Sequence, residues 1–163
     1  MDLKSLFIKI DNELQDYTKT MKDCLPLLSS YNSLDYIEFI TKNELDKLLG
    51  DDVDYIRIPI SNVNMYSPQY FDAYILVWSN RKFSRIHNHP ERGCILKVLK
   101  GSIEETRYSN PDLIKMDTIR VNEGETSYIH DNTAYHKVKN ADETRLSISL
   151  HIYAPKGYKV NYF

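Results

Sequence analysis

The stretch RIHNHPERGCILKVLKG, residues 85–101, carries the features that decide the fold. His87 and His89 lie one residue apart, and Cys94 follows after four further residues. We expect this pair to open a strand, in which residues two apart point to the same face, so both imidazoles can aim into one interior. A third histidine, His136 in AYHKVKN, begins another predicted strand. The pattern predicts a metal site of three histidines inside a β structure.

The chain on both sides of this stretch is typical of a small β protein. From residue 51 onward, short runs rich in β-branched and aromatic residues alternate with turn-forming Asn, Asp, Pro and Gly. We expect strands within residues 55–60, 73–78, 94–101, 104–108, 118–122, 126–130, 136–140 and 145–153. About eight strands of this length predict a β-barrel or a double-sheet jelly roll.

The first 50 residues have a different, helical pattern. Apolar residues with helical spacing predict a helix over 3–17, and shorter helices are expected over 34–39 and 41–49. Asp2 is the expected N-cap of the first helix, and Gly50 closes the last one. We therefore predict a single domain, 1–163, with a helical cap over 1–50 and a mainly β barrel over 51–163.

Composition narrows the classes of function. A net charge of -2 without a basic block argues against nucleic-acid binding as the main role. No apolar run is long enough for a membrane span, and the acidic N-terminal segment does not resemble a signal peptide. Two cysteines, Cys24 and Cys94, favour a reducing, cytoplasmic setting over a disulfide framework. We expect Cys24 to pack in the core and the protein to be a monomer.

The spacing of the histidines resembles the first motif of the cupins. Cys94 stands where that motif ordinarily has a glutamate, and a glycine follows at the motif distance. His136, with Asn140 four positions later, resembles the end of the second motif, although that match is partial. Without the glutamate, three neutral imidazoles leave the charge of a divalent metal to be neutralised by another ligand, such as a thiolate. Imidazoles alone would also accept zinc, copper or nickel.

Cys94 in the glutamate position makes the chain similar to the cysteine dioxygenases, a family of cupins. In that family a tyrosine and an arginine two residues apart, on a strand before the metal motif, bind the substrate carboxylate. Tyr55 and Arg57 match these positions. A guanidinium near a metal is suited to a bidentate hold on a carboxylate. The resemblance covers residues 55–155, and the segment LKVLKGSIEETRY after the cysteine is also similar to the family sequence.

A polar row near the C-terminus extends this resemblance. Ser149, His151 and Tyr153 match a serine, a histidine and a tyrosine of the family, and they share one strand face. Burying such a row is unfavourable unless its members form hydrogen bonds. In many relatives the motif cysteine and this tyrosine are joined by a thioether bond, and Cys94 and Tyr153 hold those two positions.

The resemblance implies a thiol dioxygenase. His87, His89 and His136 would hold Fe(II), and L-cysteine and dioxygen would be the substrates, giving cysteine sulfinate. Iron is implied by the family, since the ligands alone accept other metals. Arg57 favours a substrate with a carboxylate, such as cysteine or 3-mercaptopropionate, over cysteamine.

Two alternatives use the same histidines. His89, Glu91 and His136 resemble the two-histidine, one-carboxylate triad of 2-oxoglutarate/Fe(II) dioxygenases, with Arg145 at the distance of the co-substrate arginine. This pattern leaves Cys94 without a role. The second alternative is a non-catalytic metal-binding cupin.

Overall fold

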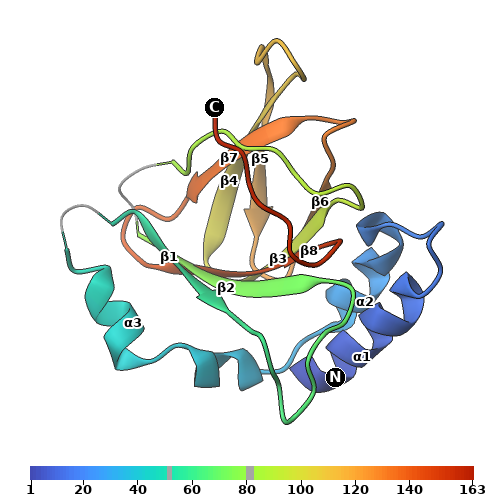
Figure 1. Cartoon of the computed structure of the whole chain (residues 1–163). Coiled ribbons are helices and arrows are strands. Elements are labelled where there is room, and N and C mark those ends of the chain that lie inside the picture. Colours follow the sequence, from blue (N-terminus) through green and yellow to red (C-terminus); the bar gives the residue numbers. More distant parts are fainter. Residues whose placement is uncertain (51–52, 80–82) are drawn as a thin grey trace.

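Two antiparallel sheets face each other and form the barrel (Figure 1). The structure, a computed structural model, describes residues 1–50, 53–79 and 83–163. The larger sheet has the order β1-β2-β8-β3-β6, and the smaller has the order β5-β4-β7. The strands are β1 (Tyr55–Pro59), β2 (Asp72–Trp78), β3 (Cys94–Lys100), β4 (Ser102–Tyr108), β5 (Lys115–Asn122), β6 (Thr126–Ile129), β7 (Tyr135–Asn140) and β8 (Ser147–Tyr153). The predicted mainly β fold with N-terminal helices is confirmed.

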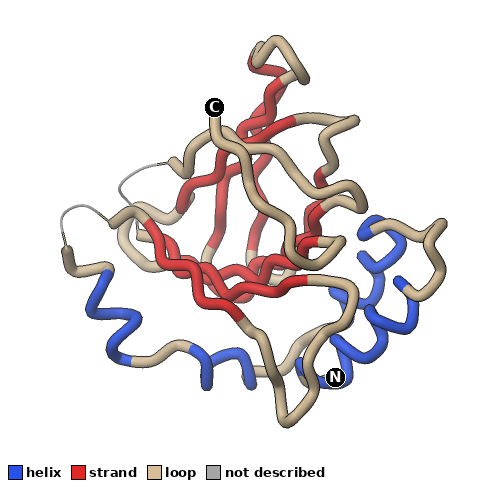
Figure 2. The backbone as a smooth tube through the Cα atoms, viewed as in Figure 1, coloured by secondary structure: helices blue, strands red, loops and turns tan. Residues whose placement is uncertain are grey.

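The larger sheet is buried on both faces. On β3, Ile95 packs into a core shared with the helices, whereas Leu96 and Val98 pack into a second core between the sheets. Figure 2 shows the helices gathered on the outer side of the larger sheet. Because both faces are covered, the central strands are apolar nearly throughout, which explains runs such as AYILVW and CILKVL.

The helical elements are α1 (Leu3–Leu14), α2 (Leu25–Ser30) and α3 (Lys42–Lys47), with 3₁₀ helices at Met21–Cys24 and Asp35–Phe39. The prediction of a helix reaching residue 17 was wrong, because α1 ends at Leu14. The Arg92 guanidinium, from the loop before β3, donates to the carbonyls of Leu14 and Asp16 and ends the helix there. That partner is distant in sequence, so local periodicity does not reveal it.

The other helices also differ from the prediction. The second predicted helix is a 3₁₀ helix over Asp35–Phe39, and the α-helix α2 (Leu25–Ser30) lies where the sequence predicted none. Pro26 lies in the first turn of α2, where a missing N–H costs nothing. Cys24 is fully buried at the junction, as predicted. Among the described residues, no helix combines the length and apolar character that a membrane span requires.

Candidate metal centre

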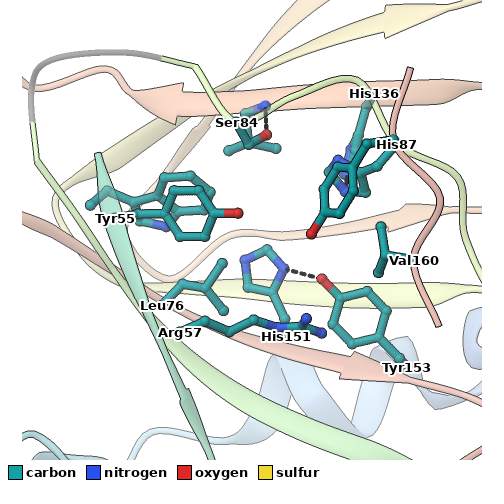
Figure 3. A pocket seen from close by; sticks show the side chains of 12 residues that line it. Tyr55, Arg57, Leu76, Ser84, His87, His136, His151, Tyr153 and Val160 are labelled. Carbon is teal, nitrogen blue, oxygen red and sulfur yellow. Dashed lines mark hydrogen bonds between the residues drawn. The ribbon is translucent and has the colours of Figure 1, made fainter. Parts of the chain in front are cut away.

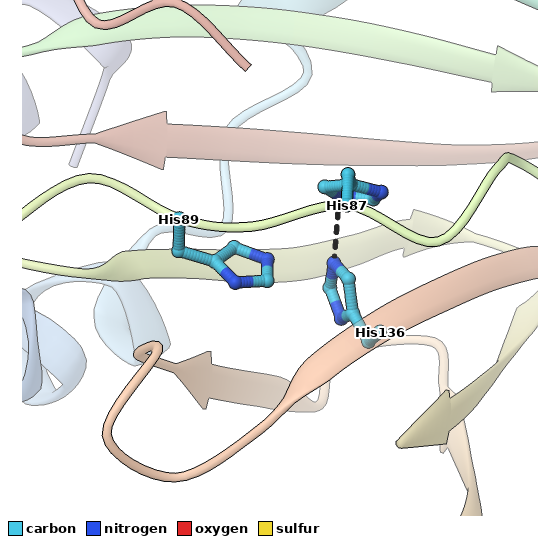
Figure 4. Close-up of side chains that lie close together, drawn as sticks. All are labelled: His87, His89 and His136. Carbon is cyan, nitrogen blue, oxygen red and sulfur yellow. Dashed lines mark hydrogen bonds between the residues drawn. The ribbon is translucent and has the colours of Figure 1, made fainter. Parts of the chain in front are cut away.

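His87 and His89 lie on the loop between β2 and β3, and His136 lies on β7 (Figure 4). The prediction that the first two histidines open a strand was wrong, because β3 begins only at Cys94. His87 instead forms a single bridge with His136, donating its backbone N–H to the His136 carbonyl at 3.0 Å. The three side chains nevertheless converge, and one nitrogen from each lies within 4.8 Å of the others.

The Nδ1 atom of each histidine contacts a protein oxygen. His87 Nδ1 lies 2.8 Å from the Arg85 carbonyl, His89 Nδ1 lies 3.3 Å from Asp131 Oδ1, and His136 Nδ1 lies 2.9 Å from Glu105 Oε1. Carbonyl and carboxylate oxygens only accept hydrogen bonds, so each Nδ1 carries the proton. In a neutral imidazole the lone pair then lies on Nε2.

The Nε2 atoms point toward a shared centre. His87 Nε2 and His136 Nε2 are 3.0 Å apart, and His89 Nε2 is buried without a hydrogen-bond partner among the described residues. Because the protons lie on the Nδ1 atoms, the lone pairs of His87 Nε2 and His136 Nε2 face each other at 3.0 Å. A cation bound between these two nitrogens would remove their repulsion. The three histidine nitrogens are therefore suited to bind a metal ion.

Burial keeps these imidazoles neutral. It lowers the pKa of His87 and of His89 to about 4, and it lowers the pKa of His136 well below its ordinary value. Neutral imidazole is the form that binds metals. Three nitrogen ligands fit Fe(II), zinc, copper or nickel.

Cys94 lies outside the ligand cluster of the described residues and directly opposite Tyr153. The two residues are cross-strand partners where β3 pairs with β8, and they belong to one buried cluster. Burial raises the pKa of the Cys94 thiol, and the Glu105 carboxylate raises it further. The thiol therefore stays protonated near neutral pH.

Ser149, His151 and Tyr153 form a continuous hydrogen-bonded row on β8. Ser149 Oγ is 2.8 Å from His151 Nε2, and His151 Nδ1 is 3.3 Å from the Tyr153 hydroxyl. Trp78 Nε1 donates to Ser149 Oγ at 2.9 Å, which satisfies the far end of the row. Leu150 and Ile152 face the helical side of the sheet, as strand alternation predicts. Burial holds the pKa of His151 well below its ordinary value, so its ring is neutral.

Arg57 and Tyr55 project from β1 toward the same space. The Arg57 guanidinium stacks on the Tyr74 ring at 3.7 Å and lies 5.3 Å from the Tyr153 ring. Stacking uses the face of the guanidinium, whereas its N–H donors lie in its plane. Tyr55 stacks on Trp78 with ring centroids 4.7 Å apart.

One pocket, drawn in Figure 3, is lined by residues from each of these groups: Tyr55, Arg57, His87, His136, His151 and Tyr153. The view has Arg57 and His151 on the side opposite His87 and His136. The pocket has a volume of about 370 Å³, including the part open to solvent. The Arg57 guanidinium, at the mouth of the pocket, thus faces the histidine nitrogens across a small cavity.

Comparison with known proteins identifies the family of this chain. The family model described as cysteine dioxygenase type I matches residues 55–163. The chain belongs to the cysteine dioxygenase type I family.

Cysteine dioxygenases of animals are similar over about half of this chain. Cysteine dioxygenase type 1 of Rattus norvegicus is 36% identical over 90 residues, and that of Homo sapiens is 34% identical over 90 residues. Each alignment covers 52% of this chain and 45% of the relative. The chain thus matches less than half of the length of these relatives.

Solved structures of oxalate decarboxylases share the fold. A Bacillus subtilis oxalate decarboxylase superposes with a TM-score of 0.57 at 14% identity, covering 69% of this chain and 29% of that one. A Lactobacillus farciminis oxalate decarboxylase gives 0.50 at 18% identity over 58% of this chain and 27% of that one. At such identities the likeness concerns the cupin fold alone.

Two carboxylates behind the ligands were missed in the sequence. Glu105 and Asp131 contact the outer nitrogens of His136 and His89, which is a frequent arrangement around metal-binding histidines. Glu105 could have been found, because it lies two residues from the buried Ile103 on β4 and so faces inward. Asp131 lies in a loop after β6, where no periodicity points to it.

Glu91, the carboxylate of the alternative two-histidine triad, lies outside the histidine cluster. The metal-ligand group found among the described residues contains three histidines and excludes Glu91. Glu91 is exposed, and its backbone carbonyl contacts His130 Nε2. Arg145 is likewise exposed, in the turn before β8. In this member of the cysteine dioxygenase type I family, the two-histidine, one-carboxylate arrangement therefore lacks its carboxylate.

Proposed function

We propose that the protein is a thiol dioxygenase that converts L-cysteine and dioxygen to cysteine sulfinate at an Fe(II) centre. The observation that carries the proposal is the convergence of three Nε2 lone pairs across a small pocket from Arg57. Membership of the cysteine dioxygenase type I family supports it. The atoms balance, because both oxygen atoms join the thiolate sulfur to give a sulfinate.

His87, His89 and His136 would hold the iron through Nε2. When bound, ferrous iron supplies the redox chemistry that dioxygen needs in order to react with the thiol sulfur. The ligand set carries no charge, so an anionic thiolate is attracted to the centre. The protein contributes orientation, charge balance and exclusion of competing reactions.

Arg57 is proposed to bind the substrate carboxylate, with help from the Tyr55 hydroxyl. The guanidinium is positioned by its stacking on Tyr74 at the mouth of the pocket. A carboxylate held there orients the substrate so that its sulfur faces the histidines. This assignment favours L-cysteine or 3-mercaptopropionate, since cysteamine lacks the carboxylate.

Ser149, His151 and Tyr153 are proposed to present a hydroxyl group to the reacting atoms. Ser149 and His151 fix the orientation of Tyr153 through their hydrogen bonds. Because burial raises the pKa of Tyr153 well above its ordinary value, its hydroxyl remains a hydrogen-bond donor. That donor can stabilise charge that develops on oxygen during the reaction.

Cys94 and Tyr153 are proposed to form a thioether during turnover. Their cross-strand pairing supports this proposal. The new carbon–sulfur bond replaces one S–H and one ring C–H bond, and dioxygen accepts the two electrons and two protons. An intact mass lower by two hydrogens after turnover would report the bond, and a Cys94→Ser variant should show no such loss.

The test of the function is oxygen uptake by the protein loaded anaerobically with ferrous iron. Addition of L-cysteine followed by air should consume one dioxygen per sulfinate formed, with no other co-substrate. Uptake that requires 2-oxoglutarate would favour the rival oxygenase. Metal binding without uptake for any small thiol would favour the non-catalytic cupin.

A further inference from the structure

Residues 158–163 form part of the pocket wall, although they belong to none of the eight strands. Val160 and Tyr162 line the pocket, and the Tyr162 ring centroid lies 6.2 Å from that of His87. Figure 1 shows this segment, in dark red, crossing in front of the space between the two sheets. In Figure 3, Val160 stands beside His87 and Tyr153. The segment therefore faces the metal centre directly.

Asn88, the residue between two of the histidine ligands, holds this segment in place. Its side-chain oxygen accepts hydrogen bonds from the Tyr158 hydroxyl and, at 2.8 Å, from the Asn161 backbone N–H. Its own backbone N–H donates to the Asn161 carbonyl at 3.2 Å. One residue of the ligand loop thus attaches the segment 158–163 beside the histidines.

A second attachment lies two residues further along. The Phe163 backbone N–H donates to the Ile86 carbonyl at 2.9 Å, and the Phe163 ring stacks on Tyr135 with centroids 4.8 Å apart. His87 and Tyr162 form an antiparallel bridge. In such extended pairing alternate side chains point to opposite sides, which explains why Val160 and Tyr162 face the pocket.

We propose that Val160 and Tyr162 determine which thiols the site accepts by limiting substrate length. The inference rests on the proposed function, in which the histidine centre holds the sulfur and Arg57 holds the carboxylate. With both ends fixed, an additional methylene has to bulge toward a wall. The lining residues Leu76 and His151 are buried within β2 and β8, whereas Val160 and Tyr162 belong to a segment outside the strands. Val160 and Tyr162 are therefore the groups that a longer substrate meets.

The first test compares L-cysteine with L-homocysteine, which is longer by one methylene. Tyr162→Ala should raise the ratio of kcat/KM for L-homocysteine to that for L-cysteine by at least about tenfold, the lower end of what one methylene contributes in a pocket. Val160→Ala should act in the same direction. Lys159→Ala, an exposed residue next to Val160, is the matched control and should leave the ratio unchanged. An unchanged ratio in both pocket variants would overturn the proposal.

The second test separates this inference from the proposed function. Anaerobic titration of the Fe(II)-loaded protein with each thiol gives two dissociation constants without turnover, and Tyr162→Ala should shift their ratio toward L-homocysteine. If the wild type binds thiols but oxidises none, the proposed function is wrong. The ratio of the two dissociation constants then still shows whether Val160 and Tyr162 limit substrate length.

The attachment of the wall can be tested without metal. In Asn88→Ala, amide hydrogen exchange of residues 158–163 should become faster in the metal-free protein, because both side-chain hydrogen bonds to Asn88 are lost. Lys159→Ala should leave exchange of the neighbouring amides unchanged. Equal exchange in Asn88→Ala and the wild type would contradict the positioning role of Asn88.

Discussion

Glu104 and Glu105 are adjacent on β4 and have opposite surroundings. Glu105 is fully buried, and it contacts His136 Nδ1 at 2.9 Å and accepts a hydrogen bond from Ser127 at 2.7 Å. Glu104 lies on the other face and forms a partly exposed ion pair with Lys139 at 3.7 Å. Only Glu105 can fix the ring of His136 and increase the electron density at its Nε2.

We expect Glu105→Gln to weaken metal binding about 10- to 100-fold, since loss of a partner behind a histidine ligand has effects of this size. Glu104→Gln is the matched control and should bind metal like the wild type. Competition with a chelator measures the dissociation constant, and the visible spectrum of the Co(II)-loaded protein reports the ligand field. Equal constants and spectra for the two variants would show that Glu105 is merely a core residue.

Arg57 and Arg145 allow the two oxygenase hypotheses to be compared at single residues. We expect Arg57→Ala to raise the KM for L-cysteine at least about tenfold, because a charge-assisted, bidentate hydrogen bond to the carboxylate is lost. Iron content should stay near that of the wild type, since Arg57 contacts none of the three Nε2 atoms. Arg145→Ala should change neither quantity. Loss of iron in Arg57→Ala, or a raised KM only in Arg145→Ala, would contradict the assignment.

At the scale of elements, β3 joins the two halves of the molecule. Its even-numbered residues face the barrel, and its odd-numbered residues face the helices. Lys97 follows this alternation into the helical side, where its ammonium group donates to the carbonyls of Ser29 at 2.7 Å, Tyr31 at 2.5 Å and Leu28 at 3.4 Å. A cation there satisfies the carbonyls at the end of α2.

We expect Lys97→Met to lower the free energy of unfolding by about 2–4 kcal/mol, because buried carbonyls lose a charged donor. Lys100→Met, at the exposed end of the same strand, should change it by less than about 0.5 kcal/mol. Urea denaturation of both variants measures the difference. A similar small change in each would mean that water satisfies the α2 carbonyls equally well.

The elements that could be predicted from sequence are those with local patterns. Composition of the short apolar runs predicted β3, strand alternation predicted the inward row on β8, and motif spacing predicted that the three histidines converge. Local patterns failed where a distant group decides the outcome. Arg92 ends α1 from the loop before β3, and Asn88 attaches the chain end to the ligand loop. Lys97 reads as a surface residue until the position of α2 is known.

At the scale of the whole molecule, four buried imidazoles make stability depend on pH. Burial lowers the pKa of His87 and His89 to about 4, and it lowers those of His136 and His151 well below their ordinary values. In an unfolded chain a histidine titrates near pH 6.5. Between about pH 6.5 and pH 4 the unfolded chain binds protons that the folded chain does not, so stability falls as the pH falls.

We therefore expect the metal-free protein to lose about 1.4 kcal/mol per pH unit for each imidazole that is protonated only when unfolded. Urea denaturation at several pH values from about 7 to 5 measures this slope. Ferrous iron, added without oxygen, should raise the midpoint near pH 7, and this gain should shrink toward pH 5 because protons compete for the ligand nitrogens. His151→Asn should reduce the slope but retain the gain from iron, since His151 lies outside the ligand set. A gain from iron that is constant across this range would contradict binding through histidine nitrogens.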